Sequence, residues 1–187
     1  MRKVKLQMQM SIDGFVAGPN GEMDWMVWNW DDALNQYVTD LTAPVDTIIL
    51  GRVLAEGFIP HWASLATNPD NTDAFATTMH ETPKVVFSKT LENHDWHQTV
   101  LATGDLTEEI ATLKSQDGGD IIVYGGGNFV SNLIKEVLID EYHFFINPTI
   151  LGRGMPIFQE LETRRALKLV STKQFECGIV VMCYEQA

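Results

Sequence analysis

The chain has few cysteines, and their spacing gives no sign of a cross-link. Cys177 and Cys183 are the only two among 187 residues. They fall in a strand-like segment late in the chain, where six residues of extended backbone would separate them by roughly 20 Å, far beyond disulfide reach. No histidine near them completes a metal-ligand pattern, and we expect no metal site. Both are predicted to be ordinary buried or half-buried thiols.

Basic residues and long apolar runs are also scarce. The 13 Lys and Arg are outnumbered by 25 Asp and Glu, for a formal charge of −12. Such a charge repels nucleic acids and anionic membranes, so a phosphate ligand would have to be held by local donors. No apolar run approaches the roughly 20 residues that span a bilayer. Because residues 1–5 lead into an alternating segment without a long apolar core, we expect no signal peptide and a cytoplasmic protein.

The remaining composition is that of one globular domain. Hydrophobic residues make up 45% of the chain and charged residues 20%, which is too apolar for general disorder. The length is sufficient for one substantial core, and no repeat, low-complexity segment or linker divides it. We predict a single domain over residues 1–187.

The most informative segment is a short apolar run, residues 121–124, that ends in Gly125, Gly126 and Gly127. From Phe129 onward, apolar residues recur at helical spacing. Bare backbone at the start of a helix lets a phosphate approach N–H groups at the positive end of the helix dipole. A plain tight turn would use the same glycines. The segment predicts a nucleotide site, with the tight turn as the alternative.

This segment matches neither of two common phosphate-binding motifs. Gly125 and Gly127 supply G-x-G, but Val130 stands where the third glycine of a dinucleotide fingerprint belongs, and the motif lies late in the chain. No Gly-Lys-Ser/Thr follows, as a P-loop would require. A different nucleotide-binding fold is indicated.

Strands alternate with helices first, and strands alone follow. The expected strands span residues 4–10, 47–50, 85–87, 121–124, 141–146, 167–175 and 179–184. One helix is expected from a cap at Asp31 or Asp32 to about Leu41, and a short helix is expected after Arg52. Two more helices are expected over residues 106–113 and 129–137. Residues 60–73 are expected to form a loop. This order predicts an α/β fold, a mixed sheet with helices on both faces and a closing hairpin.

Three of these strands end in residues that suit phosphate. Gly51-Arg52, Ser88-Lys89 and Gly125–Asn128 each follow an apolar strand. Ligands of open α/β sheets bind outside the carboxyl ends of the strands, so the three ends should converge. Arginine offers a planar fork for phosphate oxygens, serine a neutral donor and lysine a point charge. A solvated helix-start cation for Arg52 and a surface lysine for Lys89 are the plainer alternatives.

These motifs, in this order, resemble the dihydrofolate reductase superfamily, and most closely its branch that contains the reductase domain of riboflavin biosynthesis. The likeness covers essentially the whole chain, and the ordered combination is more specific than any single piece. It is carried by Ser11–Ala17, Gly21–Trp25, Gly125–Gly127 through Asp140-Glu141, Pro148–Gly154 and Pro156–Phe158.

The resemblance implies a fold, a cofactor and the residues that hold it. The fold would be a dihydrofolate reductase-like central mixed, mostly parallel sheet flanked by helices, with a C-terminal antiparallel hairpin, in a homodimer. The cofactor would be NADPH. Its diphosphate would be bound by Gly125, Gly126, Gly127, Asn128 and Phe129, with a cis bond allowed between Gly125 and Gly126. The 2′-phosphate side of the cofactor would contact Gly51, Arg52, Ser88 and Lys89. Val16 and Ala17 would complete the site.

The proton donor is where the sequence departs from the resemblance. Hydride reduction of an imine or carbonyl needs a proton at the neighbouring heteroatom, which a buried acid can deliver. Dihydrofolate reductases place this acid early in the first helix, but ungapped matching puts Ala33 there, and Asp32 is rotated from it by about 100°. Asp13, at the end of the first strand, is the better candidate for a polar role in the site, where the nicotinamide and the substrate should meet. A turn role for Asp13 and a capping role for Asp32 are the alternatives.

The substrate is less well defined than the cofactor. The family's arginine that binds the folate tail is missing, because His80-Glu81-Thr82-Pro83-Lys84 stands in its place. A riboflavin-pathway pyrimidine would need a second anion site, for which Arg153 is a candidate. We predict an NADPH-dependent oxidoreductase acting on a small heterocycle, resembling 5-amino-6-(5-phosphoribosylamino)uracil reductase. Dihydrofolate reduction and nucleotide binding without turnover are the alternatives.

Overall fold

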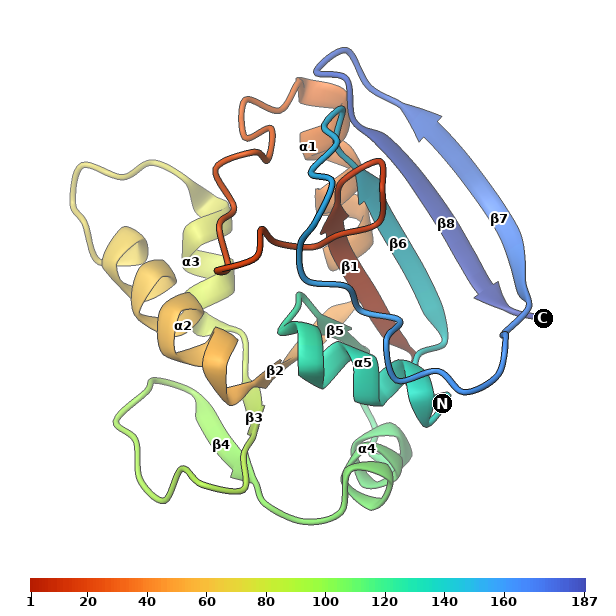
Figure 1. The fold of residues 1–187 in the computed structure, drawn as a ribbon. Coiled ribbons are helices and arrows are strands. Elements are labelled where there is room, and N and C mark those ends of the chain that lie inside the picture. The colour runs from red at the N-terminus through yellow and green to blue at the C-terminus, as the bar shows by residue number, and fades with distance from the viewer.

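The computed structural model describes all residues, 1–187, and its centre is one eight-stranded sheet (Figure 1). The strand order is β4-β3-β2-β5-β1-β6-β8-β7, in which the neighbours from β4 to β6 are parallel and the last two pairs are antiparallel. The strands are β1 (Val4–Met10), β2 (Val45–Gly51), β3 (Lys84–Phe87), β4 (Thr99–Ala102), β5 (Asp120–Val123), β6 (Glu141–Ile146), β7 (Leu167–Gln174) and β8 (Val180–Gln186). The predicted mixed, mostly parallel sheet with a C-terminal antiparallel hairpin is confirmed.

Helices cover both faces of the sheet, as the alternating pattern predicted. α4 (Leu106–Ser115) and α5 (Gly127–Lys135) pack on one face, in a core that includes Leu6 and Leu133. α1 (Asp32–Thr42), α2 (Arg52–Ala66) and α3 (Ala74–Glu81) pack on the other, in a core that includes Ile122 and Phe145. Each fully buried Leu, Ile or Phe side chain contributes about 1.5–3 kcal/mol, so these two cores supply most of the stabilisation. None of the helices has both the length and the hydropathy to cross a membrane.

The central strand β1 is apolar on one face and polar on the other. Val4, Leu6, Met8 and Met10 belong to the core with α4 and α5. Lys5 and Gln7 point to the opposite face and are also buried. Lys5 Nζ pairs with Asp120 at 2.8 Å, whereas Gln7 Oε1 has no hydrogen-bond partner. Buried polar atoms without a partner are uncommon and call for an explanation.

The prediction of a loop over residues 60–73 is wrong in its first half. α2 continues to Ala66 and contains Pro60. A proline inside a helix removes one hydrogen bond, but Ile59 and Trp62 on either side of it pack into the core, and their burial outweighs that loss. The prediction also omits α3, which Asp73 caps, and the short edge strand β4.

Asp31, rather than Asp32, caps α1. One Asp31 carboxylate oxygen accepts a hydrogen bond from Leu34 N at 2.9 Å, and the other accepts one from Cys177 N at 3.0 Å. This side chain therefore also ties the turn between β7 and β8 to the helix. Cys177 is half-buried and Cys183 is buried, and both are free thiols, as predicted.

His143 of β6 is a buried histidine that should make stability depend on pH. Its Nδ1 lies 2.8 Å from the Tyr37 hydroxyl oxygen, and Glu141, Lys5 and Cys183 are the other ionisable groups around it. Burial lowers the pKa of His143, against the opposing effect of Glu141. As the pH falls below about 6.5 the unfolded chain takes up the proton first, so the free energy of unfolding should decrease.

Urea unfolding of the wild type and of His143→Gln at about pH 7.5 and about pH 5.5 measures this effect. The decrease on acidification should be larger in the wild type. An equal decrease in both proteins would show that His143 does not cause it.

Candidate cofactor site at the carboxyl edge of the sheet

The three predicted phosphate-binding segments lie along one edge of the sheet. Gly51 at the end of β2 is in register with Phe87 at the end of β3, and Ile49 of β2 is in register with Val123 of β5. Strand spacing in a sheet is about 4.8 Å, so roughly 10 Å separates the end of β3 from the end of β5. Ser88, Arg52 and Gly125 therefore follow one another along this edge, as the sequence predicted.

The glycine segment turns the chain from β5 into α5. Gly125 and Gly126 have φ angles of 152° and 88°, a region that glycine occupies readily and other residues rarely do. These two angles make the turn with trans peptide bonds, so the cis bond that the resemblance allowed between Gly125 and Gly126 is not present. Gly125 is buried, the next two glycines are half-buried, and Asn128 is exposed.

The first turn of α5 presents backbone donors without partners. Gly126 is the N-cap and has no side chain to cap the helix. The N–H groups of Gly127, Asn128 and Phe129 have no carbonyl available within the helix, and they donate to no other protein group. Three N–H groups at the positive end of a helix dipole form an arrangement that binds anions.

Gly51 and Phe129 pack against each other directly beneath this turn. A Cβ atom at Gly51 would lie 2.7 Å from Phe129 Cβ, closer than real Cβ contacts. The Phe129 ring in turn packs against Phe87, with centroids 5.0 Å apart. The bare backbone of Gly51 thus lets α5 approach the end of β2, and both residues support the turn from below.

Arg52, Ser88 and Lys89 reach the same edge, but each has a partner within the protein. Arg52 Nη1 pairs with Glu56 at 2.6 Å on the first turns of α2, and both side chains are exposed. Ser88 is buried, and its hydroxyl accepts from the N–H of Leu91 at 2.8 Å. Lys89 Nζ donates to the Gly104 carbonyl at 2.8 Å, which binds it to the loop after β4.

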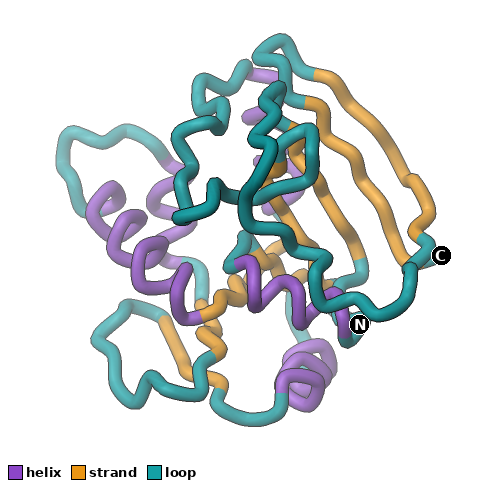
Figure 2. Tube along the Cα trace, in the orientation of Figure 1, coloured by secondary structure: helices purple, strands orange, loops and turns teal.

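Val16 and Ala17 join the loop after β1 to the segment after β6. Val16 N–H donates to the Met155 carbonyl at 2.9 Å, and Met155 N–H donates to the Ala17 carbonyl at 2.9 Å. The segment continues to Ile157, whose carbonyl accepts from the Ser131 hydroxyl of α5 at 2.7 Å. The two loops lie side by side across the front of the sheet in Figure 2. Val16 and Ala17 are therefore connected to the glycine turn, and the Ala17 N–H is unpaired.

Asp13 is an exposed carboxylate that holds the segment after β6. Its oxygens accept from Leu151 N at 3.1 Å and from Gly152 N at 2.6 Å. Hydrogen bonding, first from the Ser11 side chain and then from these two N–H groups, lowers the pKa of Asp13. The residue is thus ionised near neutral pH, when it can accept a proton but has none to donate.

Asp32 lies on the first turn of α1, exposed and without a hydrogen-bond partner. The structure does not bring it to the glycine turn through any contact. Of the three tryptophans in the preceding loop, Trp28 is 62% exposed, while Trp30 stacks on Phe145 with centroids 6.3 Å apart. Trp30 thus covers the core.

Tyr124 is a residue of this edge that the sequence did not single out. It lies between β5 and the glycines, and its ring stacks on Phe58 of α2 with centroids 5.5 Å apart. Its hydroxyl is buried and has no hydrogen-bond partner, and burial raises the pKa of the phenol. The register of β1 and β5 places Gln7, whose Oε1 is the other unpaired buried atom, beside Tyr124 on the same face.

A cavity lies at the opposite edge of the sheet. It has a volume of about 490 Å³ and is lined by the amino ends of β3 and β4, including Lys84 and Thr99. Its only ionisable group, Lys84, already donates to the His80 and Thr82 carbonyls. The cavity therefore offers no free cationic side chain to a phosphate, and the strand ends described above remain the better candidate.

Comparison with known proteins gives the family of the chain. The sequence profile of the RibD C-terminal domain matches residues 2–181. The Bacillus subtilis protein YyaP, which is uncharacterised, is 33% identical over 186 residues, covering 98% of this chain and 94% of its own.

Solved structures place the fold in the same group. The Thermotoga maritima diaminohydroxyphosphoribosylaminopyrimidine deaminase/5-amino-6-(5-phosphoribosylamino)uracil reductase superposes with a TM-score of 0.70 at 17% identity, over 100% of this chain and 57% of its own. A dihydrofolate reductase from Enterococcus faecalis, complexed with NADP(H), superposes with a TM-score of 0.62 at 14% identity, over 98% of this chain and 96% of its own. The dihydrofolate reductase-like fold is thereby confirmed, and the chain belongs to the RibD C-terminal domain family.

Proposed function

We propose that this protein is an NADPH-dependent oxidoreductase that reduces a small heterocyclic substrate of the riboflavin-pathway pyrimidine type. One observation carries the proposal: three unpaired N–H groups open α5 directly after two glycines with positive φ. They lie on the same sheet edge as Arg52 and Lys89. Membership in the RibD C-terminal domain family supports the same chemistry.

The residues of this edge suit a dinucleotide with a 2′-phosphate. The N–H groups of Gly127, Asn128 and Phe129 would bind the diphosphate oxygens. Arg52 would exchange Glu56 for the 2′-phosphate, because a doubly charged phosphate is a stronger partner than an exposed carboxylate. These donors act locally, which a chain of formal charge −12 requires for an anionic ligand.

When bound, NADPH supplies a hydride, and the protein must supply a proton to the heteroatom that becomes negative. Asp13 as an anion would orient the segment after β6 and stabilise positive charge near the reacting ring. Tyr124 keeps its proton at neutral pH and has no internal acceptor for it. We propose that the Tyr124 hydroxyl donates a hydrogen bond to the substrate, while Asp32 remains an untested second candidate for a catalytic acid.

Replacing Arg52 with Gln tests the cofactor assignment. Charge-assisted hydrogen bonds contribute about 1.5–3 kcal/mol, so Arg52→Gln should weaken NADPH binding by about 10- to 100-fold. NADH lacks the 2′-phosphate, and its affinity should change by less than about twofold. Cofactor fluorescence titrations give both constants, with Arg164→Gln, an exposed arginine in the loop before β7, as the matched control.

An equal loss for NADPH and NADH would remove Arg52 from the 2′-phosphate site. No saturable binding of NADPH to the wild type at millimolar concentration would refute the proposed function itself.

A nucleotide-binding module without turnover is the second candidate. It is favoured by the absence of a buried carboxylic acid on this edge, since Asp13 and Asp32 are both exposed. Steady NADPH oxidation with the riboflavin-pathway pyrimidine or with dihydrofolate would eliminate it and would also identify the substrate.

The homodimer and the cytoplasmic location stay predictions. Exposed Leu169 and Val170 on the edge strand β7 are apolar side chains that a dimer could cover.

A further inference from the structure

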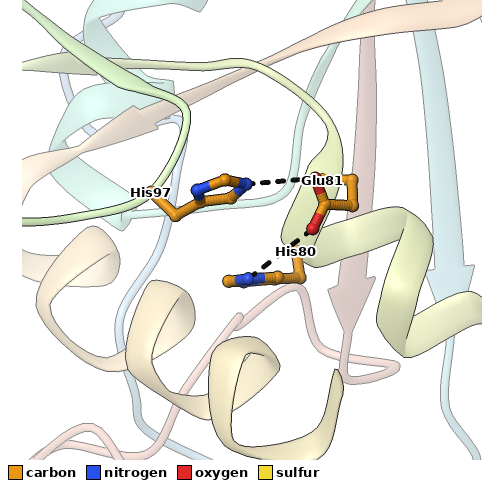
Figure 3. A group of neighbouring side chains, drawn as sticks. All are labelled: His80, Glu81 and His97. Carbon is orange, nitrogen blue, oxygen red and sulfur yellow. Dashed lines mark hydrogen bonds and ion pairs between the residues drawn. The ribbon is translucent and has the colours of Figure 1, made fainter. Parts of the chain in front are cut away.

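Two histidines and a glutamate converge on one spot near the amino ends of β3 and β4 (Figure 3). His97 Nε2 lies 3.0 Å from one Glu81 carboxylate oxygen, and His80 Nε2 lies 3.8 Å from the other. The three ligand atoms are all within 4.8 Å of one another. The two imidazole rings stack with centroids 4.7 Å apart.

The fold holds the two ligand-bearing segments together. His80 and Glu81 form the end of α3, and His97 comes shortly before β4. Lys84, only 2% exposed, lies between them: its N–H donates to the Gln98 carbonyl at 2.7 Å, and its Nζ donates to the His80 carbonyl at 2.8 Å. A buried lysine thus fixes the backbone on both sides of the cluster.

The ligand types and spacing suit a transition-metal ion. Zn²⁺ binds imidazole nitrogen at about 2.0–2.1 Å and carboxylate oxygen at about 2.0–2.2 Å, which places tetrahedral ligand atoms roughly 3.4 Å apart. His97 Nε2 and His80 Nε2 lie near that spacing from different Glu81 oxygens, at 3.0 and 3.8 Å, so a rotation of the carboxylate would be needed for one oxygen to serve with both nitrogens. Imidazole favours Zn²⁺, Co²⁺, Ni²⁺ and Cu²⁺, whereas Mg²⁺ and Ca²⁺ prefer all-oxygen sites.

Without a metal, the contacts among these three groups stabilise the protein little. His97 and Glu81 form an exposed pair 3.0 Å apart, and exposed pairs of this kind stabilise a protein little. A divalent cation would be bound by all three groups, and the negative charge of the protein would attract it. The positive charge of Lys84, packed below, repels any cation, so the ligands must bind strongly enough to overcome it.

We propose that His80, Glu81 and His97 bind one divalent transition-metal ion of the Zn²⁺ class, with a fourth position open to water. The ion would link the end of α3 to the segment that enters β4. Because the cluster lies at the amino ends of β3 and β4, opposite Ser88 and Ala102, this site is independent of the proposed reductase function.

Metal titration of the untagged, chelator-treated protein tests the proposal. Co²⁺ should produce visible absorption bands that saturate at one ion per chain, and Zn²⁺ should displace it. His97→Ala and Glu81→Gln should each weaken Zn²⁺ binding by at least about 100-fold, since even losses outside the ligand set cost 10- to 100-fold. His61→Ala, which removes a histidine from α2 instead, should bind like the wild type.

Circular dichroism of each variant establishes that it is folded, and Glu81→Gln keeps the volume of the side chain if His97→Ala unfolds. The wild type should also melt at a higher temperature with Zn²⁺ than without it, and Glu81→Gln should not. Absence of saturable binding at about 1 mM Zn²⁺, or equal binding by the wild type and both ligand variants, would overturn the site.

Discussion

Gly126→Asp should weaken NADPH binding by at least about 100-fold while the protein remains folded. Gly126 has a φ of 88°, and the nearest atoms to an added Cβ would be 3.6 Å away, at Phe129 Cβ, so a side chain fits there. A carboxylate at this position would lie near the proposed diphosphate. Like charges about 5 Å apart repel by about 3 kcal/mol at an effective dielectric constant of 20, so we expect the affinity to fall by at least about 100-fold.

Gly126→Asn is the matched control for this experiment. Asn and Asp have nearly the same shape and tolerate positive φ to a similar degree, so both variants carry the same backbone strain. Only the charge differs. Fluorescence titration should therefore find Gly126→Asn within about tenfold of the wild type, because the backbone strain of about 1–2 kcal/mol is present in both the free and the bound protein and lowers stability rather than affinity. Equal affinities for the Asn and Asp variants would place the diphosphate elsewhere.

Tyr124→Phe should lower the rate of substrate reduction strongly without destabilising the protein. The change removes a buried hydroxyl that has no partner in the free protein. An unpaired buried polar group costs about 1–3 kcal/mol, so the free energy of unfolding should be unchanged or higher by about 1 kcal/mol. If the hydroxyl assists protonation, kcat should fall by about 100-fold, within the usual range for acid–base groups.

The comparison of stability with turnover separates this role from packing. Tyr184→Phe removes a hydroxyl on β8, far from the glycine turn in the sheet order, and should leave kcat unchanged. Thermal unfolding of both variants gives the stability. A Tyr124→Phe enzyme with the kcat of the wild type would exclude the hydroxyl from catalysis, whatever its melting temperature.

The fold was largely predictable because the parallel strands are short apolar runs with clear ends. The predicted strands over residues 47–50, 85–87 and 121–124 are followed by Gly51, Ser88 and Gly125, respectively. These residues at the strand ends also indicated where the site lies. β4 escaped prediction because its four residues, Thr99–Ala102, form a half-exposed edge strand with a weak apolar signal. The continuation of α2 through Pro60 was not predicted, because proline usually ends a helix and only the tertiary packing of its neighbours stabilises the helix here.

The partners within the site were not predictable from the sequence. Asp13 and Lys89 bind backbone groups of distant segments, at Gly152 and Gly104, and no spacing rule links such residues. The His80–Glu81–His97 cluster was missed for the same reason, since 16 residues and a strand separate its two parts. Tyr124 looked like one more apolar strand residue, and only its burial without a partner distinguishes it.

The central claim is that the backbone donors at the start of α5 bind the cofactor diphosphate. Amide NMR of the isotopically labelled protein during an NADPH titration measures this directly. The N–H resonances of Gly127, Asn128 and Phe129 should shift saturably, with the same dissociation constant as the cofactor fluorescence, and their exchange with water should slow. Saturable NADPH binding that leaves these three resonances unchanged would contradict the account.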